Sequence, residues 1–221
     1  MALANETALY NLALGYVGIE NEVASTGETS AEAKLCTRFY ETCRKQLVGS
    51  YDWPWAHKVL ALANGAQVNP AAGAVAALKI YPWSYKYDYP ADCLTPRFLL
   101  PVNTTPLTGQ ERIPFEVANY DNALAIFTDE NQGTLAAPAV SLAYTMNETT
   151  TTVWPIEFDV ALALLLAANL AIPLAGEGSL RQTLMDQHRV ALAEAVSKSM
   201  DMRHRGVEKN NEVELTETRF S

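Results

Sequence analysis

Apolar side chains recur at helical spacing in the first fifty residues. A run from Glu6 to about Val17 places apolar residues three and four positions apart, which predicts a first helix. The segment Thr29-Ser30-Ala31-Glu32 then matches a capping box, in which Thr29 caps a helix and Glu32 bonds back to the cap. We therefore expect a second helix from this box to about Gly49. Its buried face would carry Cys36, Phe39, Tyr40, Cys43 and Leu47.

The pattern changes between residues 56 and 152, where prolines recur and long helices become implausible. The clearest strand is expected over 139–146, because large apolar residues alternate there with small or polar ones. This region predicts a small antiparallel sheet with long connections. The shorter strands are expected over 79–87, 98–102, 115–120 and 123–128.

Helical spacing returns after residue 153. Trp154-Pro155 opens a helix that is apolar on nearly every side up to Pro173, which predicts the central and most buried helix of the protein. Its apolar stretch is too short to span a bilayer comfortably. A second capping box, Ser179-Leu180-Arg181-Gln182, predicts a last helix to about Arg203, with His188 on its apolar face.

These elements predict a mainly α fold. A bundle of about four helices would be formed by residues 1–55 and 153–205, and residues 56–152 would form a small antiparallel β insert with long loops. Residues 206–221 are polar and mixed in charge, and they lack the apolar side chains that build a core. We expect them to form an extended C-terminal tail or arm, which is either free or becomes ordered on a partner.

The charge balance bears on the class of partner. The chain has 16 basic and 25 acidic residues, a net charge of -9, which argues against a general nucleic-acid binder. The N-terminus lacks the pattern of a secretory signal, so we expect a cytoplasmic site of synthesis. Cys36 and Cys43 lie seven residues apart on a helix, roughly 10 Å between Cα atoms, too far for a disulfide. They and Cys93 are expected as reduced thiols.

Motifs of catalysis are missing from the sequence. It contains no phosphate-binding glycine loop, no nucleophile elbow and no Cys or His pair at zinc spacing. His57, His188 and His204 are scattered. Asp88, Asp92, Glu157 and Asp159 are the carboxylates on which a hydrolase would depend, although Glu157 and Asp159 are two apart and would point to different sides of a helix.

Two groups of residues indicate binding. Lys34, Arg38, Arg44 and Lys45 make the second helix locally basic, and we interpret them as a solvated face because Glu41 pairs with Lys45. A contact with nucleic acid or an acidic partner stays open. The aromatics Trp53, Trp55, Tyr81, Trp83, Tyr85, Tyr87 and Tyr89 could stack on single-stranded nucleic acid, but packing at corners or between subunits is the better interpretation.

Three aromatic-proline motifs carry a resemblance to a known family. They are Trp53-Pro54-Trp55-Ala56, then Tyr87-Asp88-Tyr89-Pro90-Ala91-Asp92-Cys93-Leu94, then Trp154-Pro155-Ile156-Glu157-Phe158-Asp159 before an Ala/Leu-rich helix. With the first helix and the last one, their order over residues 5–203 resembles the tail tubular protein A, or head-to-tail adaptor, family of tailed bacteriophages. The motif residues that carry the resemblance are Trp53, Pro54, Trp55, Tyr89, Pro90, Asp92, Trp154 and Pro155.

The resemblance implies a structural protein of the virion. Members of the family form a ring of about twelve copies at the head-tail junction, between the portal protein and the tail nozzle or tube. Genome DNA passes through the ring during ejection without specific binding. The resemblance implies no enzyme activity, no cofactor, no metal and no membrane contact. It also implies that the C-terminal segment contacts the portal or a neighbouring copy, through Arg203, Arg205, Val207, Val213, Leu215 and Phe220.

Two other functions remain open from the sequence. A virion-associated hydrolase of cell-wall glycan would use a pair of the four carboxylates named above. A DNA-binding packaging factor would show strongly salt-dependent affinity for duplex, which the net charge of -9 disfavours.

Overall fold

A computed structural model describes residues 5–62, 65–67, 83–101, 112–130, 133–134, 137–138 and 140–217, without the side chains of 67, 133–134, 137–138 and 202–217. The chain divides into two compact units. One combines Met1–Trp55 with Glu148–Ser221, and the other is Ala56–Asn147. We call them the helical unit and the β unit.

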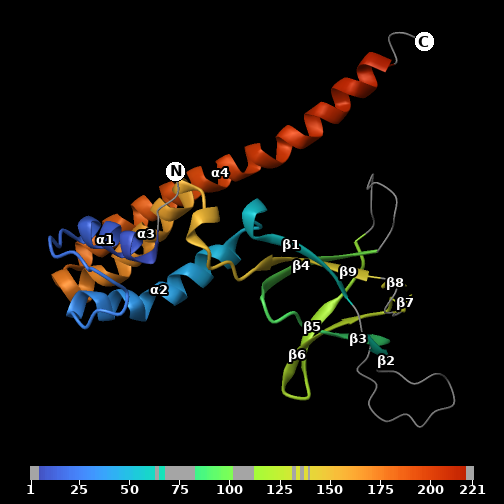
Figure 1. Ribbon diagram of the computed structural model, residues 1–221, viewed down its shortest axis with the longest axis horizontal. Coiled ribbons are helices and arrows are strands. Elements are labelled where there is room, and N and C mark those ends of the chain that lie inside the picture. The colour runs from blue at the N-terminus through green and yellow to red at the C-terminus, as the bar shows by residue number, and fades with distance from the viewer. Residues whose placement is uncertain are drawn as a thin grey trace. The chain divides into compact units, whose positions relative to one another are not determined.

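The helical unit is organised around one helix. Helix α3 (Ile156–Leu170) packs against α1 (Glu6–Val17), α2 (Ala31–Ser50) and α4 (Gly178–Glu217) (Figure 1). Most of its residues are buried, as expected for a helix that is apolar on every side. A π-helical turn, Ala171–Ala175, follows α3 and ends at Gly176, whose φ of 71° is left-handed. Short 3-10 turns lie at Pro54–Ala56 and Thr151–Val153.

Local side-chain bonds set where α1 and α2 begin. The Asn5 side chain accepts a hydrogen bond from the Ala8 amide at 2.9 Å, and α1 starts at the next residue, Glu6. For α2 the cap is Ser30, whose hydroxyl accepts from the Ala33 amide at 3.3 Å. The prediction that Thr29 caps this helix is wrong by one residue, because two adjacent hydroxyl residues fit the same sequence pattern.

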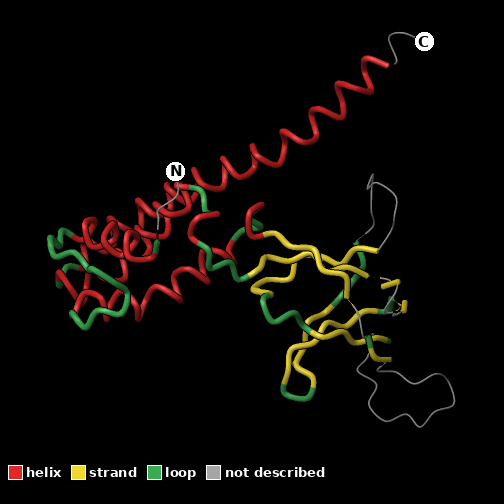
Figure 2. The backbone as a smooth tube through the Cα atoms, viewed as in Figure 1, coloured by secondary structure: helices red, strands yellow, loops and turns green. Residues whose placement is uncertain are grey.

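The β unit contains three antiparallel sheets among its described residues (Figure 2). In the first, β9 (Val140–Met146) lies between β1 (His57–Leu62) and β4 (Cys93–Pro101). The second has the order β2-β3-β6-β5, and a short β7-β8 ribbon forms the third. The bounds of these strands are Ala66–Gln67 for β2, Tyr85–Asp88 for β3, Glu116–Tyr120 for β5, Ala123–Thr128 for β6, Gly133–Thr134 for β7 and Ala137–Pro138 for β8.

The β unit has its own apolar core. Asp121 and Asn122, with φ of 53° and 64°, form the tight turn that joins β5 to β6. Gly65 packs against the buried ring of Tyr87, where an added Cβ would lie 2.5 Å from a ring carbon, so only glycine fits. The core comprises Leu62, Tyr87, Leu99, Ile126, Val140, Leu142 and Tyr144.

The predicted fold class, mainly α with a small β insert, is wrong: the protein is an α+β fold. The sequence predicted only a short strand over 98–102 in this region, whereas β4 is a nine-residue strand that contains Pro96 and Pro101. It lies at a sheet edge and its register shifts between Cys93 and Thr95 and again between Pro96 and Phe98. Edge strands and bulges are the places where a sheet tolerates proline.

The predicted extended C-terminal arm is also wrong in its conformation. The backbone of α4 is helical from Gly178 to Glu217, well past the expected end at about Arg203. A helix of 40 residues is about 60 Å long, whereas the 15 residues of α3 extend only about 22 Å. Helix α4 therefore continues beyond the length of the helix on which it packs.

Candidate functional site

The first and third aromatic-proline motifs form one cluster in the helical unit. The rings of Trp53, Trp55 and Trp154 all lie around Phe158, with ring centroids 5.3, 4.7 and 5.2 Å from it. The Trp53 indole is fully buried and donates to the Leu47 carbonyl at 3.1 Å. Pro54 begins the 3-10 turn after α2, and Pro155 is the N-cap of α3. These residues pack the segment that follows α2 against the start of α3.

The second motif anchors the β unit through Asp92. Its carboxylate accepts from Lys58 Nζ at 2.6 Å and from the Tyr144 hydroxyl at 2.8 Å. The hydrogen bond from Lys58 holds the pKa of Asp92 below its usual value, and burial raises the pKa of Tyr144. Next to this network, the Cys93 amide donates to the Pro90 carbonyl at 3.0 Å, and burial raises the pKa of Tyr89. Asp92 thus links β1, β4 and β9.

The carboxylates considered for hydrolysis are divided between the two units. Asp159 is fully buried in α3, and the Glu157 carboxylate binds Lys198 Nζ of α4, which lowers the pKa of Glu157. Asp88 is largely exposed and lies 3.9 Å from Lys86. Asp92 is held in the network described above. Asp88, Asp92 and Glu157 each lie beside a lysine, whereas Asp159 is buried and its Oδ1 atom accepts no hydrogen bond within the described part of the chain.

Sequence reasoning missed one buried cation. Arg44, which was grouped with the solvated basic face, is only 1% exposed, and that part of the interpretation is wrong. Its guanidinium donates to the Glu148 carbonyl at 2.6 Å and to Glu41 at 3.0 Å. The signal was present, because position 44 lies one turn after the buried Tyr40 on the same helical face. Arg44 fixes the segment with which the chain re-enters the helical unit.

The described histidines have structural surroundings. His188 is buried between α4 and α3, where Nδ1 lies 2.8 Å from the Ala161 carbonyl oxygen, and burial lowers the pKa of its imidazole. Since a carbonyl oxygen can only accept, Nδ1 carries the proton. His57 in β1 lies beside the ring of Phe98, at 6.2 Å between centroids. The side chain of His204 lies outside the described residues.

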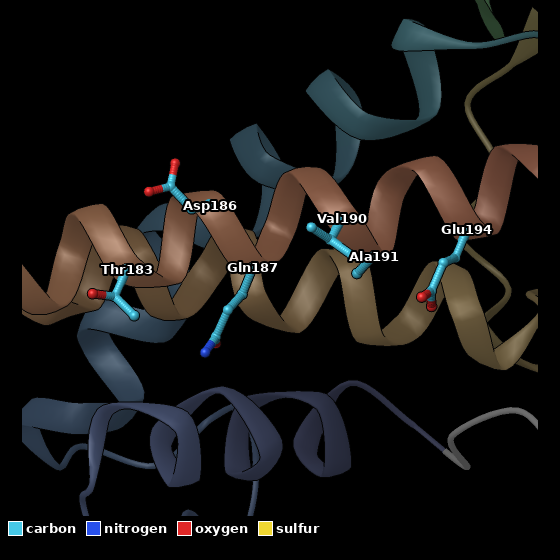
Figure 3. Close-up of a pocket in the computed structure, with 6 residues that line it drawn as sticks. All are labelled: Thr183, Asp186, Gln187, Val190, Ala191 and Glu194. Atoms are coloured by element: carbon cyan, nitrogen blue, oxygen red, sulfur yellow. The ribbon is translucent and has the colours of Figure 1, made fainter.

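A hollow of the helical unit follows one face of α4. We call it the α4 groove (Figure 3). It has a volume of about 480 Å³, and Val190, which is 62% exposed, is one of the residues that line it. A smaller hollow of about 100 Å³ adjoins it, shares Ala191 and Glu194, and adds Ile156 and Val160 of α3. The residues that line the α4 groove are Thr183, Asp186, Gln187, Val190, Ala191 and Glu194.

The predicted contact residues of the C-terminal segment are only partly described. The backbone of α4 is helical at Arg203, Arg205, Val207, Val213 and Leu215, and Phe220 lies outside the described residues. The structure brings these positions onto one continuous helix instead of a coil. Their side-chain contacts stay predictions.

Two further observations concern cofactors and membranes. Within the described ranges, no group of three or more His, Cys, Asp and Glu side chains is arranged to hold a metal ion. The segment Ile156–Ala175 is long and apolar enough to cross a membrane, but 67% of its most apolar window is buried within the protein, as is usual for a central core helix.

Comparisons with known proteins assign the chain to no family. No family model matches the sequence, and a search of curated proteins finds no match.

Proposed function

We propose that this chain is a head-to-tail adaptor of a tailed bacteriophage, a structural protein of the virion. About twelve copies would form a ring between the portal protein and the tail nozzle or tube, with genome DNA passing through the channel. The order of the aromatic-proline motifs supports this proposal. The structural roles of the motif residues also support it. Trp53, Trp55 and Trp154 pack within the helical unit, and Asp92 links strands of the β unit.

The observation that carries the proposal is the length of α4. Helix α4 is about 60 Å long and α3 is about 22 Å long, so the last turns of α4 extend past α3. Because helices in proteins gain most of their stability from packing, we infer that these turns pack on another chain in the assembly. In an adaptor that chain is the portal protein or a neighbouring copy. The contact residues would be Arg203, Arg205, Val207, Val213 and Leu215 of α4, with Phe220 after it.

The net charge of -9 suits passage of DNA. A channel that neutralised phosphates with lysine and arginine would bind the duplex tightly and slow its movement, whereas an acidic protein does not retain it. The adaptor would therefore contact DNA only in passing.

The test is assembly with the portal protein encoded by the same genome. The purified chain and the portal would be mixed and examined by light scattering and electron microscopy. We expect a ring of the chain bound to one face of the portal. A chain that stays monomeric with the portal present would contradict the proposal, whereas a monomer without the portal would not, because adaptors can assemble only on contact.

A shortened variant tests the role of α4 in this assembly. We expect a chain that ends at Asp201 to keep its helical signal and thermal transition in circular dichroism, because His188 and Lys198, whose side chains bond α3, both lie before that residue. It should fail to bind the portal. Portal binding at the level of the full chain would show that the C-terminal turns of α4 are not the contact.

A further inference from the structure

We propose that neighbouring copies of this chain dock through two faces of the helical unit: the exposed face of α2 in one copy enters the α4 groove of the next. The inference rests on the proposed function, since it names the contact that joins copies within the ring. Two different faces of one chain make a heterologous contact, which closes into a ring when the rotation between copies allows it.

The α4 groove offers an apolar floor with an acidic rim. Val190 and Ala191 form the floor, and Ile156 and Val160 extend it across α3. Asp186 and Glu194 also line it, and Figure 3 shows their side chains projecting from opposite sides of α4. Asp186 pairs with Arg189 of its own helix at 2.7 Å, an exposed pair that a partner's cation can replace or join. An apolar residue exposed inside a hollow gains free energy when a partner covers it.

The exposed face of α2 offers the complementary chemistry. Lys34, Arg38 and Lys45 are exposed along it, and Leu35 and Phe39 lie half-buried at its edge. Lys45 pairs with Glu41 of its own helix at 3.5 Å, whereas Lys34 and Arg38 have no ion pair among the described residues. We call this set the α2 ridge. It presents cations beside apolar side chains, as the groove presents carboxylates beside an apolar floor.

The spacing of the charges also matches. Arg38 and Lys45 are seven residues apart, about 10 Å along a helix, and Asp186 and Glu194 are eight apart, about 12 Å. Two helices packed side by side can therefore bring both cations to both carboxylates, while Phe39 covers Val190. Charge pairs of this kind at the rim of an apolar contact set the choice and register of the partner.

The two faces belong to different sides of the same unit. Helices α2 and α4 both pack on α3, and Figure 1 shows α3 between them. One copy can therefore use its ridge and its groove at once, each toward a different neighbour. Closed rings require this arrangement.

Charge reversal tests the contact. Arg38→Glu and Glu194→Lys each place like charges across the interface, and the double variant with both changes restores opposite charges. We expect each single variant to weaken the association of copies roughly tenfold and the double variant to recover most of it. Ring formation on the portal would be measured by electron microscopy, and association of the chain alone by sedimentation at high concentration. Glu20→Lys, the same charge change at an exposed loop position, is the control.

Each outcome decides the inference. It is overturned if both single variants assemble like the parent chain, or if the double variant assembles no better than the single ones. If Glu194→Lys weakens binding to the portal and Arg38→Glu does not, the groove takes the portal protein instead of a second copy. A parent chain that forms no ring on the portal contradicts the proposed function; sedimentation then decides the inference, which also fails if the chain alone does not associate.

Discussion

At the scale of the residue, the aromatic-proline motifs are packing devices. Trp53, Trp55 and Trp154 come from two distant parts of the sequence and meet at Phe158, where edge-to-face ring contacts hold them. Buried polar side chains also stabilise this unit. Arg44 donates a hydrogen bond to the Glu148 carbonyl, and His188 bonds the backbone of α3. The helical unit therefore depends on a few side chains whose loss leaves a cavity or an unmatched polar atom.

Trp53→Ala should destabilise the helical unit by about 3–5 kcal/mol, because it removes a fully buried ring and leaves the Leu47 carbonyl without its indole donor. Chemical denaturation followed by circular dichroism in the helical band would measure the change. Trp83→Ala, which removes a half-buried indole from the β unit, is the control. Equal effects of the two variants on the helical transition would contradict the role given to Trp53.

His188 should make the stability of the helical unit depend on pH. Burial lowers the pKa of its imidazole, so the unfolded chain takes up the proton first as pH falls. Stability is therefore complete above the ordinary histidine pKa of about 6.5 and is lost progressively below it. Denaturation midpoints between about pH 7.5 and pH 5.5 would show this slope, and His188→Gln should flatten it. His57→Gln, in the β unit, should leave the slope of the helical transition unchanged.

At the scale of the element, neighbouring residues set where a helix begins, whereas a strand depends on pairing with a distant segment. Helices α1, α2 and α3 begin within two residues of their predicted starts, because caps and apolar spacing are properties of neighbouring residues. Strand β1 was missed, since Val59 and Leu60 are exposed and its residues do not alternate. It exists because six of its residues pair with β9. Pairing between distant segments is not visible in either segment alone.

The cap of α2 can be assigned by two adjacent substitutions. Ser30→Ala should lower stability by about 1 kcal/mol, because the Ala33 amide loses its acceptor. Thr29→Ala should change stability little, since Thr29 is exposed and lies before the cap. The difference in denaturation midpoint between the two variants is the measurement. A larger loss for Thr29→Ala would restore the capping box expected from the sequence.

At the scale of the whole molecule, the chain folds into two units with separate cores. Residues Ala56–Asn147 form one continuous segment, and their apolar cluster is drawn from five strands, β1, β3, β4, β6 and β9. The helical unit is assembled from both ends of the chain around α3. A continuous segment with its own core meets the usual description of a domain.

A fragment of residues 56–147 should therefore fold by itself. We expect a β-type circular dichroism spectrum and dispersed amide resonances, because the core of the unit lies entirely within the fragment. Asp92→Ala in the fragment should lower its melting temperature, since Lys58 and Tyr144 lose their shared acceptor. A fragment without dispersed resonances would show that the unit needs the helical one to fold.

The sequence by itself determined the first three helices, the strand over Ala123–Thr128 and the aromatic-proline corners, because caps, apolar spacing and proline geometry act between neighbours. Only the tertiary structure decided that the β segments form a full second unit, that Arg44 is buried, and that a groove lies along α4, whose helical backbone continues to Glu217. Those features depend on strand pairing and side-chain burial across distant parts of the chain. The local pattern is the same whether or not such contacts form.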